Sequence, residues 1–458
     1  MNRFRHLLPA LLLLIAALPA SAEVHEFFLD NGMQILVKED RRAPVAVSMV
    51  WYRVGSGHEH DGITGISHAV EHMMFKGTET YGPGVFSRLV AERGGRSNAF
   101  TGRDFTAYFQ QIDRVHLDKM LYLEADRMRG LLFDPEEFAR EMEVIKEERR
   151  LTLDDNPRAV AGERFNAVAF ASSPYRHAII GWMSDIESYT LDDLRAWYAR
   201  WYAPNNAILV VVGDVDAEAV HAKAQRHFGP IPARAIVPPK PRPEVEPLGE
   251  RRATVRIPAQ VPLVSLRYLT PSLATADDPD DAYALAVAAA VLGGSTTARL
   301  QSRLEREREI VSSVSTGYNL YARLDDLFTV NAVPADGHDV AAVEAALRAE
   351  VARLRDERVD ESELERIRIR VLADNVFQQD SLFYQGMLLG MLETAGIGWR
   401  ELDAYAERIR AVTPEQVQSV ARRYLVDDRL TVGILEPIAG AAPPGHGLGD
   451  SRPLMHAR

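Results

Sequence analysis

The sequence predicts an α+β protein made of two homologous halves, each a sandwich-like unit in which helices pack on an antiparallel-rich sheet. Hairpin and strand patterns alternate with helical patterns along the chain. The ends of the two halves align without gaps, and this alignment places Thr190 on Thr413 and Trp201 on Tyr424. A segment with seven prolines, Gly229 to Leu248, lies between the halves and is typical of a linker.

The first half begins with strand patterns. A hairpin from Glu26 to Lys38 is predicted to turn at Asp30-Asn31-Gly32, because these residues favour the backbone of a tight turn. The valine-rich residues 45–54 predict a strand, and residues 97–101 and 105–110 predict a second hairpin. Hairpins join antiparallel strands, so this half should contain a mainly antiparallel sheet.

Helices are predicted where apolar residues recur at helical spacing. In the first half they cover residues 85–93, 115–129, 136–154 and 190–202, and a buried strand follows at 208–212. The second half repeats this pattern, with strands within residues 255–269 and helices at 281–292 and 297–309. Two related halves of about 200 residues each are the simplest explanation.

The N-terminus has the three parts of a secretory signal peptide. Arg3 and Arg5 give a positive start, Leu7 to Leu18 is nearly all apolar, and Ala20-Ser21-Ala22 resembles a cleavage site. We therefore expect a periplasmic or secreted protein whose mature chain starts at Glu23. No later apolar run is long enough to predict a membrane span.

The predicted organisation has five parts along the chain. They are a signal peptide (1–22), an N-terminal domain (23–229), a proline-rich linker (230–250), a C-terminal homologous domain (251–440) and a flexible tail (441–458). The second half contains nothing like the histidine motif described below, so the chemistry is assigned to the first half.

Composition excludes several classes of function. The formal net charge of −12, with no basic stripe, argues against nucleic acid as a partner. The chain has no cysteine, so an exported protein of this sequence must rely on its hydrophobic core. Any zinc must then be held by histidine and carboxylate side chains alone.

The strongest chemical signal is the sequence His68-Ala69-Val70-Glu71-His72. On a helix, the two histidines lie one turn apart on the same face, where they can share one tetrahedral Zn²⁺. Glu71 lies beside them and can take a proton from water at such a site. The order H-x-x-E-H is a metallopeptidase signature, although surface residues can produce the same letters by coincidence. The segments that follow decide between these interpretations.

Another histidine pair, His58 and His60, precedes the motif in a glycine-rich loop. An H-x-H pair can bind a metal ion, but exposed loop histidines are the simpler interpretation. We therefore leave the pair out of the predicted site.

The charged helix predicted at residues 136–154 carries a second set of candidates. Most of its glutamates are expected on a solvated face. Glu141 and Glu148 are two helical turns apart and point the same way, with Ile145 at the margin of their face. A partly buried carboxylate needs a partner, and a metal ion would serve.

Three segments together resemble the pitrilysin/insulysin family of zinc metallopeptidases, and within it the branch similar to mitochondrial processing peptidase. They are HAVEHMMFKGT, SNAFTGRDFTAYF and EMEVIKEERR, in the family's order. The resemblance covers nearly the whole mature chain. It implies a bacterial exported peptidase whose halves form a clamshell when two units pair. It also implies that His68 and His72 bind zinc and that Glu71 is the general base.

The resemblance further implies a third zinc ligand at a fixed distance in the sequence after the second histidine, and a supporting glutamate two helical turns before that ligand. Glu148 stands at the family's spacing from His72, and Glu141 stands at the supporting position. Glu147 is the adjacent alternative, but on a helix it faces about 100° away. Glu148 is therefore the predicted ligand, with Glu141 behind it.

The family also implies a peptide site. Asn98 and Ala99 would lie on an edge strand beside the zinc, where a substrate adds as an extra strand. Taken without the family, Asn98 would be interpreted as a turn residue. Because edge addition requires an extended chain, small or unfolded peptides are the expected substrates.

One departure concerns an arginine and a tyrosine that catalytic members of the family carry in the second half. In an ungapped match Glu305 stands at the arginine position and Ser312 at the tyrosine position. Arg308 and Tyr318 could replace them only after a shift of register. We therefore expect a homologous partner subunit to supply the pair.

The sequence thus predicts a zinc-dependent endopeptidase that acts as the zinc-bearing subunit of a two-subunit enzyme. Two alternatives remain. The chain could be a non-catalytic structural subunit, or a zinc-stabilised peptide-binding subunit of the same fold in which Glu71 has no catalytic role.

Overall fold

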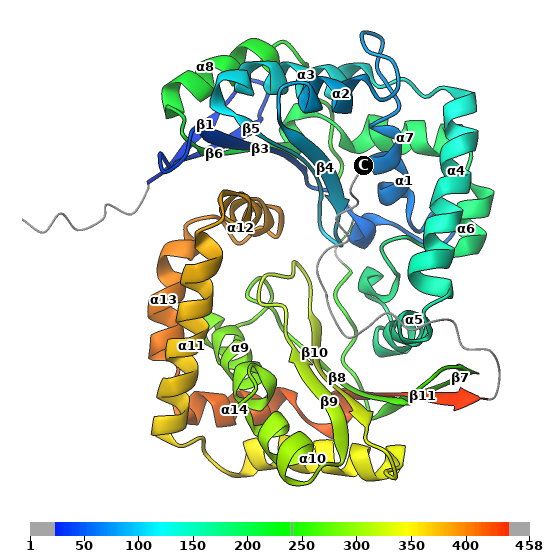
Figure 1. Cartoon of the computed structure of the whole chain (residues 1–458), viewed down its shortest axis with the longest axis vertical. Helices are drawn as coiled ribbons and strands as arrows, with labels where there is room; N and C mark the ends of the chain where they lie inside the picture. Colours follow the sequence, from blue (N-terminus) through cyan, green and yellow to red (C-terminus); the bar gives the residue numbers. More distant parts are fainter. Residues whose placement is uncertain (1–22, 239, 241, 439–458) are drawn as a thin grey trace, which may run out of the picture.

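The computed structural model describes residues 23–238, 240 and 242–438, and in it two sheets are surrounded by helices (Figure 1). The predicted signal peptide and C-terminal tail lie outside the described residues. The first sheet has the strand order β1-β2-β6-β3-β5-β4 and the second the order β7-β11-β8-β10-β9. The α+β fold with two related halves is therefore confirmed.

The strands are mostly short and alternate with helices along the chain. In the first sheet they are β1 (Val24–Phe28), β2 (Gln34–Glu39), β3 (Val45–Tyr52), β4 (Arg96–Thr101), β5 (Thr106–Asp113) and β6 (Ala207–Gly213). In the second they are β7 (Arg251–Pro258), β8 (Leu263–Thr270), β9 (Val311–Gly317), β10 (Asp326–Pro334) and β11 (Leu430–Ile438).

The helices of the first half are α1 (Ile66–Met73), α2 (Val85–Ala91), α3 (Leu117–Gly130), α4 (Pro135–Arg149), α5 (Pro157–Ala169), α6 (Met183–Ser188), α7 (Leu191–Trp201) and α8 (Ala217–His227). Those of the second half are α9 (Pro279–Gly293), α10 (Val340–Asp356), α11 (Glu361–Gln379), α12 (Leu382–Thr394), α13 (Glu401–Ala411) and α14 (Pro414–Tyr424).

Apart from the additional edge strand β1 in the first sheet, the two sheets have the same topology. In the first sheet β2 runs parallel to β6 and the other neighbouring strands are antiparallel. In the second sheet β7 runs parallel to β11 and the others are again antiparallel. Thr190 begins α7 and Thr413 begins α14, each in a capping box that satisfies backbone N–H groups of the first turn. The ungapped alignment of the two halves therefore matches equivalent elements.

The alternation of side chains along each strand gives the first sheet two apolar faces. Val37 and Val50 belong to the core on the side of α1, α3, α7 and α8. Met49 and Trp51 belong to a separate cluster on the opposite face, together with Leu389 of α12. A sheet buried on both faces in this way needs a second layer of cover, and part of that layer comes from the other half.

The two halves exchange one helix each. Helix α12, from the second half, covers the inner face of the first sheet, and α5, from the first half, packs on β7 and β11 (Figure 1). Glycines allow both approaches. A Cβ atom at Gly390 would overlap the ring of Trp51, and one at Gly433 would overlap the ring of Phe165. This exchange sets how the two sheets face each other.

Two of the predicted helices are wound differently from the expectation. Helix α4 ends at Arg149 and continues as a π-helical turn, Arg150–Asp154. The helix predicted at 297–309 contains a π-helical segment, Gln301–Glu307, where an α-helix was expected. Within this turn, the hydroxyl of Thr152 donates to the carbonyl oxygen of Glu148 at 2.7 Å. Such turns often occur beside functional residues.

The described part of the proline-rich segment between α8 and β7 contains no helix or strand. This agrees with its composition, because proline lacks the backbone N–H that regular structure uses. Among the helices that the structure describes, none has both the length and the apolar character needed to cross a bilayer.

Candidate metal centre

The histidine motif lies on α1, a helix that is buried along its whole length. His68 and His72 project from one face, and their Nε2 atoms lie 3.2 Å apart. Apolar neighbours in the sequence, such as Ala69, Val70 and Met73, pack into the core of the first half. The amphipathic spacing therefore directs the two imidazoles away from the core and toward α4.

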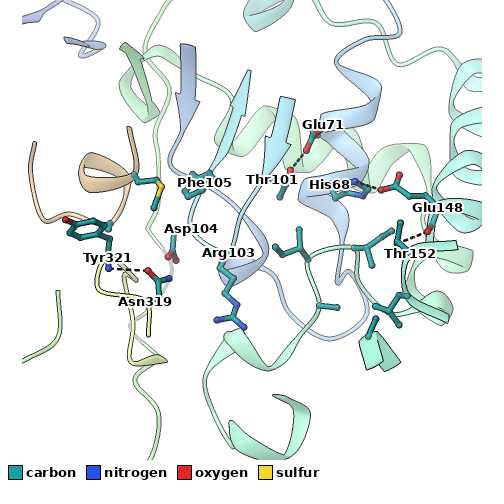
Figure 2. Close-up of a pocket in the computed structure, with 17 residues that line it drawn as sticks. His68, Glu71, Thr101, Arg103, Asp104, Phe105, Glu148, Thr152, Asn319 and Tyr321 are labelled. Atoms are coloured by element: carbon teal, nitrogen blue, oxygen red, sulfur yellow. Dashed lines mark hydrogen bonds and ion pairs between the residues drawn. The ribbon is translucent and has the colours of Figure 1, made fainter. Parts of the chain in front are cut away.

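Helix α4 brings the carboxylate of Glu148 to the same point. Its Oε1 lies 3.5 Å from His68 Nε2, and its Oε2 lies 3.3 Å from His72 Nε2. Figure 2 shows His68 and Glu148 facing each other across the end of a cavity. The side chain of Glu147 is 58% exposed and forms an ion pair with Arg150, whereas that of Glu148 is 12% exposed. Of the two adjacent glutamates, only Glu148 meets the histidines.

The donor atoms fit a single zinc ion. Tetrahedral zinc with bonds of about 2.0–2.1 Å separates neighbouring nitrogen and oxygen donors by about 3.3 Å. The separations among His68, His72 and Glu148 run from 3.2 to 3.5 Å. Within the described residues, these three are the group of histidine and acidic side chains that could hold a metal ion. Neutral imidazoles with one carboxylate are also a donor set that zinc prefers.

Glu141 supports one of the histidines from behind. Its Oε1 lies 2.8 Å from His72 Nδ1, and its Oε2 lies 2.5 Å from the ammonium of Lys76. With the proton on Nδ1 donated to this carboxylate, the Nε2 lone pair of His72 points at the metal position. Lys76 had not been predicted as part of the site, although it stands within the HAVEHMMFKGT segment.

Glu71 is buried and lies on the cavity wall beside His68. The hydroxyl of Thr101, at the end of β4, donates to Glu71 Oε2 at 2.6 Å. Figure 2 shows this contact. The bond holds the carboxylate close to His68, which is where a base acting on water is needed. Thr101 was also absent from the sequence prediction, although it belongs to the SNAFTG segment.

Asn98 and Ala99 lie on β4, which is the last strand of the first sheet. They pair with Phe109 and Tyr108 of β5, so the other edge of β4 faces away from the sheet. The side chain of Ala99 is buried and that of Asn98 is half-buried. The structure therefore brings this edge strand next to the candidate metal centre through Thr101.

A cavity of about 690 Å³ opens from the metal centre between the two halves. Figure 2 shows the first half contributing His68, Glu71 and Thr101, and the second half contributing Asn319 and Tyr321 on the opposite side. Its apolar lining residues are Phe105, Leu153, Ala159, Ala178, Ile179, Ile180, Met391 and Ala395. The cavity thus has a polar end at the metal centre and a largely apolar body.

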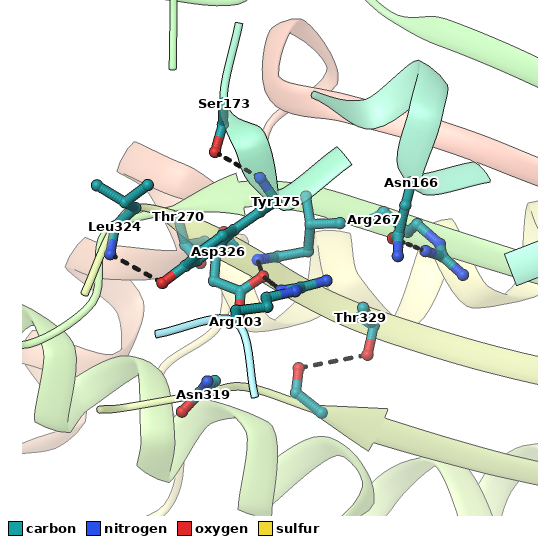
Figure 3. Close-up of polar contacts among 12 residues, drawn as sticks. Arg103, Asn166, Ser173, Tyr175, Arg267, Thr270, Asn319, Leu324, Asp326 and Thr329 are labelled. Carbon is teal, nitrogen blue, oxygen red and sulfur yellow. Dashed lines mark hydrogen bonds and ion pairs between the residues drawn. The ribbon is translucent and has the colours of Figure 1, made fainter. Parts of the chain in front are cut away.

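Two ion pairs join the halves beside this cavity. Arg103 pairs with Asp326 at 2.9 Å, and Asp104 pairs with Arg323 at 2.9 Å. Figure 3 shows Arg103 and Asp326 in contact close to Tyr175, over whose ring the guanidinium of Arg103 lies at 4.7 Å. Arg103 and Asp104 also line the cavity. These contacts hold the second half against the hairpin that follows β4.

Four residues are candidates, from the sequence, for the arginine and tyrosine positions of the family. None of them lines this cavity, whether in the ungapped match (Glu305 and Ser312) or after the shift of register (Arg308 and Tyr318). Glu305 and Arg308 lie at the π-helical segment, and Arg308 is exposed. Ser312 is exposed on β9, and the Tyr318 hydroxyl donates to the carbonyl of Pro271 at 2.7 Å. The shifted pair, Arg308 and Tyr318, is therefore not found beside the metal centre.

His58 and His60 stay outside the candidate site, but only one of them is the exposed histidine that was predicted. His60 is exposed, whereas His58 is half-buried, with Nδ1 accepting from the N–H of Gly55 at 3.3 Å. Burial, with the charges of Arg323 and Arg200, lowers the pKa of His58 to about 3. The prediction of two exposed histidines is thus wrong for His58, because the tertiary packing of its loop covers the ring.

Comparison with known proteins is consistent with this geometry. The family model described as insulinase, peptidase family M16, matches residues 34–181, which contain every candidate ligand. A second model, described as the M16 inactive domain, matches residues 188–371. Zinc protease PqqE of Helicobacter pylori is 30% identical over 415 residues, covering 89% of this chain and 92% of that protein.

Solved structures agree on the fold. A protease from Helicobacter pylori superposes with a TM-score of 0.86 at 29% identity, covering 91% of this chain and all of that one. The periplasmic protease PqqL from Escherichia coli superposes with a TM-score of 0.76 at 20% identity. This chain covers 53% of PqqL, so the PqqL chain is about twice as long.

Proposed function

Since the chain belongs to the M16 family of peptidases, we propose that it is a zinc-dependent endopeptidase that cleaves small or unfolded peptides. One observation carries the proposal. His68, His72 and Glu148 converge at the spacing of zinc ligands, and Glu71 lies beside them on the wall of a cavity. A site that only stabilised the fold would not need a buried carboxylate next to the metal position and a cavity that reaches it.

The residues of this chain have distinct parts in hydrolysis. His68, His72 and Glu148 would hold the zinc ion, which would supply Lewis-acid chemistry that polarises a carbonyl and makes water more acidic. Glu71 takes a proton from the attacking water and later delivers it to the leaving amine. Thr101 keeps the Glu71 carboxylate in place through its 2.6 Å hydrogen bond.

The edge of β4 supports a peptide substrate. An extended peptide that adds to this edge would hydrogen-bond to the backbone around Asn98 and Ala99 and pass the end of the strand at Thr101, next to Glu71. Folded proteins do not present a free extended backbone, so unfolded segments fit better. The apolar body of the cavity favours apolar side chains near the bond that is cut.

A homologous partner subunit is the second part of the proposal. The second half presents Asn319 and Tyr321 to the cavity, and among its described residues no arginine lines it. The PqqL chain is about twice as long as this one. By analogy, a second unit of this architecture could pair with this chain and complete a chamber around the site. The partner would supply the arginine and tyrosine pair that the family resemblance leads us to expect.

A second candidate function is a non-catalytic or zinc-stabilised peptide-binding subunit. The observation in its favour is that residues 188–371 match a model described as an inactive domain. That match excludes His68, Glu71, His72 and Glu148, all of which fall in the other match.

Export to the periplasm or the medium is also part of the proposal. N-terminal sequencing of the exported protein is expected to give Glu23 as its first residue.

Replacement of Glu71 by Gln tests the function. The variant keeps the shape of the side chain but cannot accept a proton, so peptide cleavage should fall by about 10²–10⁴-fold while bound zinc stays at the wild-type level. The assay uses the chain together with its co-purifying partner and an unfolded peptide. Glu147→Gln is the matched control, because Glu147 is exposed, and it should cleave like the wild type. Undiminished cleavage by the mixture that contains Glu71→Gln would show that Glu71 has no catalytic role and that the activity comes from the partner, which would favour the binding subunit.

A further inference from the structure

The first turn of α1, which carries the candidate ligands, has no cap from its own residues. Its N-cap is Gly65, which has the left-handed backbone (φ 89°) and no side chain to accept a hydrogen bond. The first backbone N–H groups of any helix lack partners within the helix. In a buried helix such as α1 these groups must find partners elsewhere, or the helix start would be destabilised.

Glu59 supplies these partners from outside the helix. Its Oε2 accepts from the N–H of Gly65 at 2.6 Å, and its Oε1 accepts from the N–H of Ser67 at 2.8 Å. The side chain reaches past the intervening loop, and the residue is 3% exposed. A carboxylate at this end is also favoured by the helix dipole.

The loop between Glu59 and the helix is held from a second side. Asp185, on α6, accepts from the N–H groups of Gly62 and Thr64 and from the Thr64 hydroxyl, the last at 2.6 Å. Gly65 itself packs so closely that a Cβ atom would overlap the carbonyl oxygen of Ile180. The loop is therefore fixed by Asp185 and by packing, whereas the first turn of the helix is fixed by Glu59.

The position of this turn matters because the metal ligands come from two helices. His68 follows Ser67 directly, while Glu148 is placed independently by α4. Metal–ligand distances must be correct to within about 0.2 Å, so a small tilt of α1 would separate His68 from Glu148. We infer that Glu59 is a positioning residue of the metal centre, which acts by holding the N-terminal turn of α1. This inference rests on the proposed function only for the identity of the metal.

Burial and the two backbone donors have opposite effects on the negative charge of Glu59. Burial raises the pKa of Glu59 to about 7, the negative charge of Asp185 adds to the rise, and the bonds from Gly65 and Ser67 oppose it. A buried carboxylate is costly, and here it is kept where two backbone donors meet it. Glutamine has the same shape but only one amide oxygen, so it cannot accept from both N–H groups at once.

The test compares the zinc affinities of the full-length wild type and its variants, measured by competition with a chelator. Glu59→Gln should bind zinc about 10–100-fold more weakly than the wild type. Asp360→Asn is the control, because Asp360 also accepts from two backbone N–H groups at a helix start, in the second half. It should lower the melting temperature of the zinc-free protein and leave zinc affinity unchanged. Equal zinc affinity in Glu59→Gln and wild type would overturn the inference.

A second variant covers the case in which Glu59→Gln is not recovered in folded form. Glu59→Asp keeps the charge but is one methylene shorter, so it should also bind zinc more weakly, and unchanged affinity would again contradict the inference. Failure of the proposed function is a separate outcome. A wild type that binds zinc but cleaves no peptide, together with a weakened Glu59→Gln, would leave the positioning role standing. A wild type that binds no zinc would overturn both.

Discussion

At the level of single residues, one position along α4 decides which carboxylate reaches the histidines. Glu147 and Glu148 are neighbours in the sequence, but they point about 100° apart on a helix. Glu148 lies 3.3 Å from His72, whereas Glu147 forms an exposed ion pair with Arg150. Exposed pairs of this kind contribute little to stability, so the two glutamates should respond very differently to substitution.

Glu148→Gln is expected to lower zinc affinity by more than about 100-fold, because it removes the only carboxylate of the proposed donor set. Glu147→Gln should stay near the wild type, and Glu141→Gln should lose about 10–100-fold, because Glu141 only orients His72. Zinc titration against a chelator measures all three. The reverse order of Glu147 and Glu148 would show that the ligand assignment is wrong.

His58 predicts a pH dependence of stability. Its pKa is about 3 in the folded protein, against 6.5 for an ordinary histidine. Between these values the unfolded chain binds the proton and the folded chain does not, so stability falls as the pH is lowered from 6.5 toward 3. His58→Asn keeps an acceptor for the N–H of Gly55 but does not titrate. In urea unfolding of zinc-free protein, it should lose less stability than the wild type between pH 7.5 and pH 5. Parallel losses in both proteins would contradict this expectation.

At the level of elements, the exchange of α5 and α12 ties the two halves together. Each of these helices packs on the sheet of the other half, and a glycine allows the close approach in both cases. The two helices occupy equivalent places in the repeat, since each follows the long charged helix of its half. The orientation of the cavity therefore depends on how closely these two helices pack, and each of them also lines the cavity, α12 with Met391 and α5 with Ala159.

Gly390→Ala should destabilise the protein by about 1–3 kcal/mol, because the new Cβ atom would overlap the buried ring of Trp51. Gly130→Ala is the matched control, since a Cβ atom at this helical glycine meets nothing within 4 Å. It should be neutral or slightly stabilising, because alanine favours the helix. Chemical denaturation measures both, and equal stabilities would show that α12 can shift away from β3 at no cost.

At the level of the whole molecule, the metal centre and the cavity lie where the two halves meet. The first half supplies the ligands and the base, and the ion pairs of Arg103 and Asp104 hold the second half beside them. The second half lines the cavity with Asn319, Tyr321, Met391 and Ala395, and none of these is an arginine. The arginine that the family resemblance leads us to expect would then come from a partner subunit.

We expect the single chain to cleave unfolded peptides at least about 10²–10³-fold more slowly than a mixture with its homologous partner, because one missing oxyanion donor typically costs that much. The comparison uses monodisperse, zinc-loaded chain with and without the co-purifying subunit. A Glu71→Gln chain mixed with the same partner serves as the control for activity of the partner itself. Equal rates for the lone chain and the mixture would remove the need for a second subunit.

Local sequence patterns predict many of the secondary-structure elements and most of the candidate metal ligands. The hairpins and the spacing of His68, Glu71 and His72 depend on residues close together in the chain, where backbone geometry alone decides which side chains share a face. The same argument pairs Glu141 with Glu148 on α4. These predictions needed no knowledge of how the helices pack.

Contacts between distant segments could be decided only by the tertiary structure. The burial of His58, the support of Glu71 by Thr101, and the exchange of α5 and α12 all join elements whose relative placement local patterns do not encode. The failure of Arg308 and Tyr318 to reach the cavity has the same cause. Local sequence patterns predict which side chains could bind zinc, and packing decides where those side chains meet, because a metal site requires sub-ångström agreement between helices that are distant in the sequence.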